Sequence, residues 1–360
     1  MDQGAKKRLL DLTPLEISDL VLDMGEKPYR AEQLLAGLFR RGARTFADFT
    51  DLAKNYRERL SQIAEIGPRL TLIESAQSQD GAQKLLWRAP DGLAFESVLI
   101  PEKGHYTLCL STQVGCALGC RFCRTGDLGL SRDLSQGEIL AQVLEAKKFV
   151  PQDQKLTNIV FMGMGEPLLN LKALLNALFI LNSPKYLAFA GSKISLSTVG
   201  IPKGLTALAE SGHKIGLTVS LGAAQDALRD ELMPINRRFP LSELKKALLA
   251  YPLKSGQRFT IAYVLLKGVN DSPTDALALS RFLADLKTKI NLIPFNPWPN
   301  APFERPDEAT IQKFWRVLYD KNHTVMVRWS KGGAVAGACG QLAGGNLGLA
   351  KNRPKELDLA

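Results

Sequence analysis

The chain has 360 residues, of which 45% are hydrophobic and 23% are charged, a composition that is typical of a globular protein and excludes a disordered or fibrous one. No apolar run approaches the roughly 18 residues of a membrane-spanning helix, and the first residues lack the apolar stretch of a signal peptide. We therefore expect a cytoplasmic protein without a membrane partner. The net charge of +10 favours a polyanionic partner such as nucleic acid, although a basic solvated surface explains it equally well.

Residues 1–68 predict a small helical domain. Apolar residues recur at helical spacing between residues 13 and 64, and the pattern breaks at residues 25–28, which contain glycine and proline. Arg40, Arg41 and Arg44 form a basic cluster that is suited to guiding RNA, although a plain packing role is equally open. We interpret this region as an accessory RNA-binding domain.

Residues 69–104 predict a short β-hairpin extension, because alternating apolar and polar runs are separated by Asp-Gly turns. From residue 105 the pattern changes to strand, loop and helix in turn. The candidate strands are residues 107–111, 158–162, 193–198, 214–221, 259–266 and 290–295. Six such units within residues 105–322 predict an α/β fold, a partial (β/α)6 barrel similar to a TIM barrel, with its chemistry at the carboxyl ends of the strands. Residues 323–360 form a separate C-terminal segment.

Three of the five cysteines, Cys116, Cys120 and Cys123, follow the first strand of that barrel within eight residues of one another. Their spacing, C-x3-C-x2-C, is suited to zinc or to an iron–sulfur cluster. An iron–sulfur cluster with only three cysteines leaves one iron open for a substrate. A structural zinc site needs a fourth ligand, for which the sequence offers Cys109, Cys339, His105, His213 and His323.

The cysteine spacing, with Phe122 before the last cysteine, resembles the signature of radical S-adenosylmethionine (SAM) enzymes. That resemblance implies a 4Fe–4S cluster whose free iron binds SAM, and one electron from the cluster that cleaves SAM to a 5′-deoxyadenosyl radical. The segment GMGEP at residues 163–167 resembles the glycine-rich SAM motif of the superfamily, and Ser197 resembles a residue that contacts SAM.

A narrower resemblance covers residues 10 to 345 and rests on five segments in the right order. The segments are LSTQVGCALGCRFC, MGMGEPLLN, RDELMPINRRFP, NLIPFNP and ACGQLAGG. They are similar to the RlmN and Cfr class of radical SAM RNA methyltransferases. The resemblance implies methylation of an adenine ring carbon, at C2 for the RlmN type and at C8 for the Cfr type. We favour C2 methylation of 23S ribosomal RNA, with transfer RNA as a further substrate.

The same resemblance implies roles for the remaining two cysteines. Cys339, on a glycine-rich tail that we expect to be mobile, is methylated by a first SAM, and the radical made from a second SAM removes a hydrogen atom from that methyl group. The carbon radical then joins adenine to the protein. Glu96 corresponds to the base that helps to release the product, and Cys109 to the thiol that forms a transient disulfide with Cys339. Otherwise Cys109 reads as a buried strand residue and Glu96 as an exposed strand carboxylate.

Further positions carry over from the family by their place in its motifs. The implied SAM contacts are Gly165, Glu166, Ser197, Ser220, Leu221, Gly222 and Asn296. Arg229, Arg237 and Arg238 are candidates for phosphate contact, although ion pairing is the commoner role of such arginines. The family implies a flavodoxin or ferredoxin as reductant. No association surface is evident in the sequence, so we expect a monomer.

The sequence departs from the family pattern near the implied substrate. Gly222 stands where histidine is usual and Ala262 where glutamate is usual. Arg124 replaces a small residue, and Gly333 and Ala334 lie in a loop that is usually acidic. Methylation at C8, another RNA target, and a non-catalytic RNA-binding protein that holds zinc or a cluster therefore remain alternatives at this point.

Overall fold

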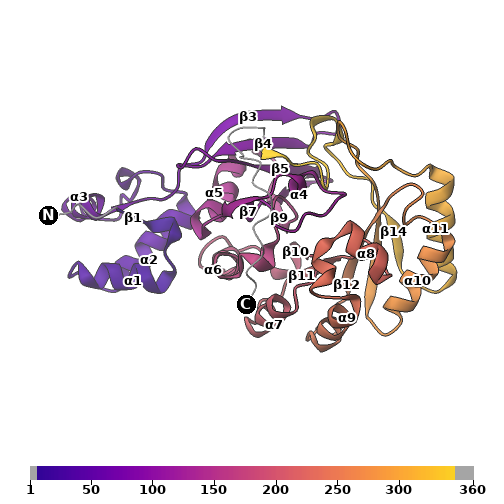
Figure 1. The fold of residues 1–360 in the computed structure, drawn as a ribbon. Helices are drawn as coiled ribbons and strands as arrows, with labels where there is room; N and C mark the ends of the chain where they lie inside the picture. The colour runs from indigo at the N-terminus through magenta and orange to yellow at the C-terminus, as the bar shows by residue number, and fades with distance from the viewer. Residues whose placement is uncertain (1–5, 345–360) are drawn as a thin grey trace.

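The computed structural model describes residues 6–344 and places one large sheet at the centre of the molecule (Figure 1). Within these residues the sheet has ten strands, in the order β14-β13-β12-β11-β10-β9-β6-β5-β4-β3. Strands β6 and β9 to β14 pair in parallel, whereas β3, β4 and β5 pair antiparallel and join the rest through β5 and β6. The strands are β3 Thr71–Gln77, β4 Gln83–Arg88, β5 Ala94–Glu102, β6 His105–Cys109, β9 Leu156–Phe161, β10 Ile194–Thr198, β11 Gly216–Ser220, β12 Phe259–Leu265, β13 Thr288–Pro294 and β14 Val325–Val327.

Helices connect the consecutive parallel strands, as right-handed βα connections require. They begin at strong caps: Ser135 caps α5 and Ser272 caps α10, each through a reciprocal capping box. The connecting helices are α5 Gln136–Ala146, α6 Leu171–Asn182, α7 Pro202–Glu210, α8 Asp226–Leu232, α9 Leu241–Ala250, α10 Pro273–Leu283 and α11 Glu308–Asp320. Their buried leucines and isoleucines join the strands in one hydrophobic core.

The N-terminal helices lie at one end of the molecule, and α11 lies at the other (Figure 1). They are α1 Pro14–Asp23, α2 Tyr29–Leu35, the π-helix η2 Ala36–Arg41 and α3 Lys54–Ile63, with the short pair β1 Lys7–Arg8 and β2 Ala64–Glu65 beside them. This part docks on the start of α5. Gln136 donates its side-chain amide to the carbonyls of Leu10 and Leu12 at 3.1 Å, and Gly137 N–H donates to the Asp11 carboxylate at 2.8 Å.

The structure confirms the predicted mixed α/β content, with a central parallel sheet. All six predicted barrel strands are present, and the predicted hairpins are β3, β4 and β5. These hairpins extend the main sheet, because β5 pairs with β6 along its second half. Strand β14 was not predicted, since its three residues are too few to show an alternating pattern. Residues 1–5 and 345–360, which belong to the predicted N-terminal domain and C-terminal segment, lie outside the described residues.

None of the helices between residues 6 and 344 is both long enough and apolar enough to cross a bilayer.

Candidate active site

A cavity lies at the carboxyl ends of the parallel strands, where parallel α/β folds place their chemistry. Strands β9 to β13 each contribute side chains to its wall. Nine of the thirteen predicted site residues line it together: Cys116, Cys120, Cys123, Gly165, Glu166, Ser197, Ser220, Asn296 and Cys339. The tertiary structure thus brings residues from positions 116 to 339 into one site.

The cysteine loop is inserted between two short strands, β7 Gln113–Gly115 and β8 Leu130–Asp133, which pair as an antiparallel ribbon. The loop spans residues 116–129 and contains the four-residue helix α4 Arg124–Asp127. Cys116 N–H donates to the Gly129 carbonyl at 2.8 Å and closes the loop at its base. Gly115 has φ +82°, and a Cβ there would lie 1.9 Å from the Gly129 oxygen, so only glycine fits this position.

The three cysteines are free thiols, as a cluster site requires before it is loaded. Burial raises the pKa of Cys116 to about 12, and burial likewise raises the pKa of Cys120 and of Cys123. Three buried thiols ionise together only if cations replace their protons, which is how metal binding couples to thiol deprotonation. No group of three His, Cys, Asp or Glu residues within residues 6–344 is arranged to hold a single metal ion.

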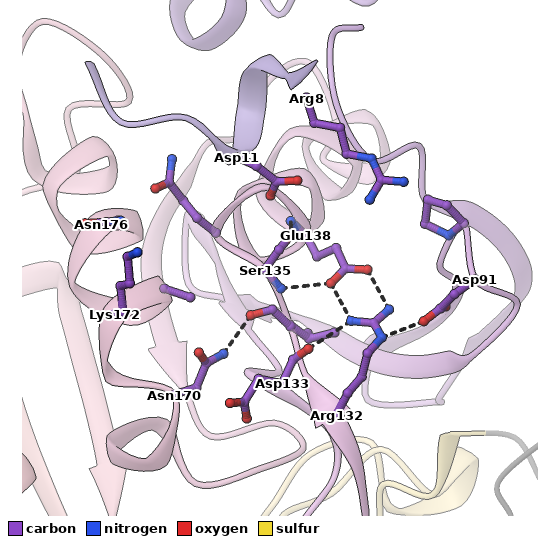
Figure 2. A pocket seen from close by; sticks show the side chains of 14 residues that line it. Arg8, Asp11, Asp91, Arg132, Asp133, Ser135, Glu138, Asn170, Lys172 and Asn176 are labelled. Atoms are coloured by element: carbon purple, nitrogen blue, oxygen red, sulfur yellow. Dashed lines mark hydrogen bonds and ion pairs between the residues drawn. The ribbon is translucent and has the colours of Figure 1, made fainter. Parts of the chain in front are cut away.

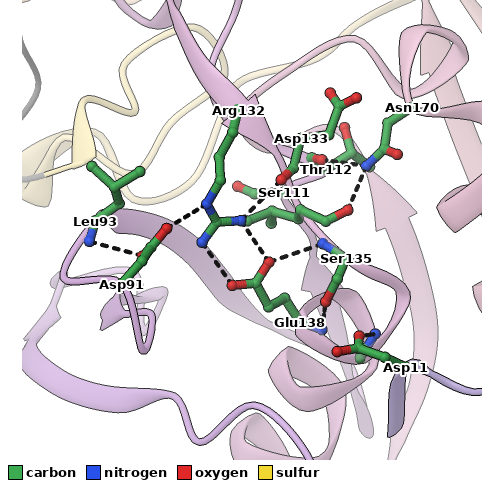
Figure 3. Close-up of polar contacts among 12 residues, drawn as sticks. Asp11, Asp91, Leu93, Ser111, Thr112, Arg132, Asp133, Ser135, Glu138 and Asn170 are labelled. Atoms are coloured by element: carbon green, nitrogen blue, oxygen red, sulfur yellow. Dashed lines mark hydrogen bonds and ion pairs between the residues drawn. The ribbon is translucent and has the colours of Figure 1, made fainter. Parts of the chain in front are cut away.

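Arg132 on β8 fastens the ribbon that carries the cysteine loop (Figure 3). Its guanidinium donates to both oxygens of Glu138 on α5, at 2.7 and 2.8 Å, and its Nε donates to Asp91 in the β4–β5 turn. Such a forked pair fixes both position and orientation. The network forms one wall of a polar pocket that contains no cysteine, with Asn170 and Lys172 across from it (Figure 2).

The GMGEP turn packs tightly against the strand that precedes the cysteine loop. A Cβ at Gly163 would lie 2.5 Å from the Leu110 carbonyl oxygen. Gly165 has φ +99°, and a Cβ there would lie 2.5 Å from the side chain of Gln113. Gln113 in turn accepts a hydrogen bond from Glu166 N–H at 2.8 Å. The two glycines therefore let the turn after β9 lie directly against residues 110–113.

Glu166 is buried in the cavity wall with each carboxylate oxygen bonded to the backbone. Leu168 N–H donates to one oxygen at 3.0 Å and Val199 N–H to the other at 2.9 Å. Burial nevertheless raises the pKa of Glu166 to about 7, against the lowering effect of these bonds. Nearby, the hydroxyls of Ser197 on β10 and Ser220 on β11 lie 3.3 Å apart. This corner of the cavity offers a carboxylate and two hydroxyls to a polar ligand.

The segment that carries Cys339 is tied to both sides of the cavity. Asn296 donates its amide to the Cys339 carbonyl at 3.1 Å. Arg124 N–H donates to the Gly340 carbonyl, and the Thr125 hydroxyl donates to the Leu342 carbonyl, both at 2.7 Å. Arg124 thus contacts the Cys339 segment through its backbone N–H, which every residue type except proline would also provide.

Cys109 and Glu96 lie behind the Cys339 segment and do not line the cavity. Burial, together with the nearby Cys339, raises the pKa of Cys109 to about 12. Glu96 is buried, not exposed as a strand carboxylate would be by default. Its carboxylate pairs with Lys84 at 3.0 Å and accepts hydrogen bonds from Ala343 and Gly344 N–H at 2.7 and 3.2 Å. Both predicted residues therefore contact or adjoin the segment that carries Cys339.

Two predicted positions, Leu221 and Gly222, lie outside the cavity lining. Leu221 is buried, and its carbonyl accepts a hydrogen bond from Arg229 at 2.9 Å. A Cβ at Gly222 would lie 2.5 Å from the Met233 sulfur, and its φ of +72° suits glycine. Arg229 is buried and also donates to Val199 O and to Asn236, so its role as a phosphate contact is wrong. A buried arginine bonded to backbone carbonyls supports the fold.

Comparisons with known proteins agree with this geometry. Residues 7–66 match the family described as the ribosomal RNA large subunit methyltransferase N-terminal domain, and residues 110–279 match the radical SAM superfamily. The dual-specificity RNA methyltransferase RlmN of Solidesulfovibrio magneticus is 45% identical over 93% of this chain and 95% of its own length. That of Geotalea uraniireducens is 44% identical over 94% of this chain and 97% of its own.

The chain belongs to the RlmN family of radical SAM RNA methyltransferases. The crystal structure of a radical SAM methyltransferase from Sphaerobacter thermophilus is similar to it, with a TM-score of 0.89, 39% identity, and coverage of 94% of this chain and 99% of that one. Family membership confirms the interpretation drawn from the motifs and replaces the alternative of a non-catalytic binding protein. The protein is a SAM-dependent RNA methyltransferase whose cofactors are a 4Fe–4S cluster and SAM, used twice per turnover.

The sequence patterns missed several polar residues that line the cavity of this RlmN-family protein, and Asn291 is one of them. Asn291 on β13 lines the cavity and is buried, and its side-chain oxygen has no hydrogen-bond partner within residues 6–344. It pairs in register with Ala262 on β12. The available signal was an asparagine between the apolar residues Ile290 and Leu292 of a buried stretch, where a polar side chain is unfavourable unless it finds a hydrogen-bond partner. An unpartnered acceptor on a residue of the cavity lining fits a ligand with donor groups.

Proposed function

We propose that the protein methylates C2 of an adenine in 23S ribosomal RNA and in transfer RNA, through a methylated Cys339. One observation carries the proposal: Cys339 lines the same cavity as the three cysteines of the loop, with Cys109 beside it. A methyltransferase that acted by direct transfer from SAM would need neither Cys339 nor Cys109 at this point. The dual-specificity relatives support both RNA classes.

Cys116, Cys120 and Cys123 would hold the cluster. When bound, the cluster and SAM supply a methyl group for Cys339 and a 5′-deoxyadenosyl radical. A carbon between two ring nitrogens is electron-poor and does not attack a methyl cation donor, so a radical route is required. Cys339 carries the methyl group, gives up one hydrogen atom from it and forms the new bond to adenine. Asn296 orients Cys339 by holding its carbonyl.

The adduct radical would return one electron to the cluster, and loss of the proton from the adenine carbon restores the aromatic ring. Cys109 then attacks the Cys339 sulfur as a thiolate. A disulfide forms, the bond between that sulfur and the transferred carbon breaks, and its electron pair takes up a proton to complete the methyl group. Burial raises the pKa of Cys109, so this attack needs a base or a shift of the Cys339 segment that admits solvent. Glu96 is our candidate for the base that removes the proton from the adenine carbon. Its carboxylate is occupied by Ala343 and Gly344 N–H, and it becomes available when that segment shifts.

The proposed SAM contacts are divided between side chains and backbone. Glu166, Ser197, Ser220 and Asn296 present polar groups to the cavity, and Gly165 lets the backbone approach the ligand. Leu221 and Gly222 would act through their backbone, since they lie beside β11 but not in the lining. Among these, Glu166 is suited to the SAM ammonium group, because a cation beside its buried carboxyl favours the ionised form.

The remaining expectations belong to the same proposal. Residues 1–68 would be the RNA-binding accessory domain, residues 69–104 a connector, residues 105–322 a partial barrel, and residues 323–360 the segment that carries Cys339. We propose that the protein acts as a monomer in the cytoplasm and receives electrons from a flavodoxin or ferredoxin. The ties between Cys339 and its surroundings describe one state of a segment that must move during turnover.

Mass spectrometry of nucleosides tests the function directly. Ribosomal or transfer RNA is incubated with the reconstituted enzyme, SAM and a low-potential reductant, and is then digested. We expect 2-methyladenosine, and none from a Cys339→Ala variant. If 8-methyladenosine is the product, the ring position is wrong and the departures at Gly222 and Ala262 are the first candidates for the cause. Unmodified RNA with a filled cluster would refute the proposal.

A further inference from the structure

A second cavity, of about 630 Å3, lies between the N-terminal helices and α5 and shares no residue with the active-site cavity. Its lining is strongly basic, with six cationic side chains and one acidic side chain, Glu145. The six cations are Arg40, Arg41, Arg44, Arg69, Lys147 and Lys148. Like charges repel at such close quarters, so this arrangement is unfavourable unless an anion occupies it.

Internal ion pairs neutralise only part of this charge. Glu145 is shared by Arg44 and Lys148, and Arg41 pairs with Asp51 at 2.9 Å. The side chains of Arg40 and Arg69 make no hydrogen bond or ion pair within residues 6–344. Lys147 lies over the ring of Phe189, 5.9 Å from its centre, and no carboxylate pairs with it in the same part of the chain. Three cations therefore face the cavity without an acidic partner.

The three unpaired cations come from three separate segments. Arg40 lies in the last turn of the π-helix η2, Arg69 lies in the linker before β3, and Lys147 follows α5. Glycine fixes the two turns involved: Gly42 closes η2 with φ +68°, and a Cβ at Gly67 would lie 2.7 Å from Leu10. The cations are thus presented by both sides of the junction between the helical domain and the sheet.

The kinds of side chain that line this cavity indicate which kind of anion it binds. The cationic side chains are exposed at the rim, whereas the floor is apolar and includes Leu10, Phe39 and Leu70. Phe39 is buried, so it is not available to stack on a base. Among the lining residues, the cations are exposed, no aromatic ring is free to stack on a base, and no cluster of buried hydrogen-bond donors surrounds one point. Such a lining suits a polyanion with spaced charges better than one small anion.

We propose that this junction binds the phosphodiester backbone of the RNA substrate, away from the reactive adenine, and clamps the helical domain against the sheet. The proposal rests on the function proposed above and adds a second, sequence-independent contact to it. Phosphate contacts of this kind set the register of the RNA and contribute affinity, but they do not read bases. The site therefore engages long substrates and leaves short ones unaffected.

Two triple variants with equal loss of charge test the site. Arg40→Gln/Arg69→Gln/Lys147→Gln removes the unpaired cations. The matched control, Lys313→Gln/Arg316→Gln/Lys321→Gln, removes three exposed cations on and after α11, at the opposite end of the molecule (Figure 1). Thermal melting and cluster absorbance of both variants, compared with wild type, confirm that they are folded. Each is assayed with full transfer RNA and with a short hairpin RNA that carries the reactive adenine.

For the junction variant with transfer RNA we expect the slope of log Kd against log salt to fall by about 2 to 3, and the Kd near physiological salt to rise about tenfold. The KM for transfer RNA rises in parallel, whereas kcat and the KM for the hairpin stay unchanged. In the control variant, the salt slope, the Kd and the KM for transfer RNA change only as much as the loss of three charges far from the RNA causes. Inorganic phosphate at constant ionic strength does not compete with the RNA.

Three results would overturn the proposal. Equal salt slopes for the two triple variants, while wild type still methylates both RNAs, would refute the junction site and leave the enzymatic function intact. Competition by inorganic phosphate would indicate a small-anion site instead. If wild type binds and methylates neither RNA, the proposed function fails together with the site.

Discussion

Cys109 is the buried residue to which the proposed reaction assigns the resolution of the covalent adduct. We predict that Cys109→Ala still accepts the methyl group on Cys339 and still joins adenine, because neither step uses Cys109. The adduct then cannot be resolved, so protein–RNA conjugate accumulates as a slow band in denaturing gels. Cys339→Ala is the control and forms no conjugate. Normal turnover by Cys109→Ala, without conjugate, would remove Cys109 from the reaction.

Asn291 is a second residue whose importance depends on its surroundings. Since its side-chain oxygen has no partner, Asn291→Leu loses no internal hydrogen bond there and should leave the free energy of unfolding unchanged or slightly higher. We expect the KM for SAM to rise about tenfold, the equivalent of one lost hydrogen bond of about 1.4 kcal/mol.

Asn170 provides the contrasting control for that experiment. Its amide donates to the carbonyls of Thr112 and Leu134 at 2.8 and 2.7 Å. Asn170→Leu should therefore lower the free energy of unfolding by about 1–3 kcal/mol, because both carbonyls lose a buried donor. Denaturant titration measures both variants. If Asn291→Leu is the more destabilised of the two, Asn291 is a structural residue and not a ligand contact.

At the scale of elements, the β7–β8 ribbon decides where the cysteine loop lies. Arg132 joins this ribbon to α5 through Glu138 and to the β4–β5 turn through Asp91 (Figure 3). We predict that Arg132→Gln lowers the free energy of unfolding by about 1–3 kcal/mol, since charge-assisted hydrogen bonds are lost. The ribbon then holds the three cysteines less firmly, so the iron content of the isolated protein should fall.

A spectroscopic readout separates this positioning role from general destabilisation. The electron paramagnetic resonance spectrum of the reduced cluster should broaden in Arg132→Gln, and Arg132→Lys should restore it only in part, because lysine cannot make the forked contact. Arg88→Gln, on the exposed end of β4, is the matched control. An unaltered spectrum and iron content in Arg132→Gln would mean that the ribbon is fixed by its strand pairing alone.

At the scale of the whole molecule, the burial of Glu166 links stability to pH. Because burial raises its pKa to about 7, the folded protein holds a proton that the unfolded chain releases near the ordinary value of 4.5. The stability that this proton contributes is full below pH 4.5 and is lost as the pH rises through about 7. SAM-free and cluster-free protein should therefore lose stability over this range, and Glu166→Gln should show a flatter curve in urea titrations at pH 5, 6, 7 and 8. Parallel curves for the two proteins would contradict a buried protonated carboxyl.

The whole molecule also depends on how its distant parts meet at residues 331–344. Gly332 N–H donates to Asp80 in the hairpins, Gly340 accepts from Arg124 in the cysteine loop, and Ala343 donates to Glu96 on β5. Movement of this segment is therefore a whole-molecule event and not the motion of a free tail.

The sequence by itself determined the chemistry and the order of the elements. The cysteine spacing, the GMGEP turn and the motif around Cys339 are local patterns. Each needs particular side chains or glycines within a few consecutive residues, so the sequence alone shows it. Alternation and helical spacing likewise predicted the six barrel strands and the helix that begins after Ser135. The same reasoning failed for β14, which is too short to show a period, and for Arg229, whose burial no local pattern reveals.

Only the tertiary structure decided which of these residues meet. It brought Cys339 to the cysteine loop, buried Glu96 against Ala343, left Asn291 without a partner and gathered Arg40, Arg69 and Lys147 at one junction. Burial, hydrogen-bond satisfaction and the summed field of charges depend on groups that are far apart along the chain. No periodicity or motif encodes them, because they arise from packing the elements together.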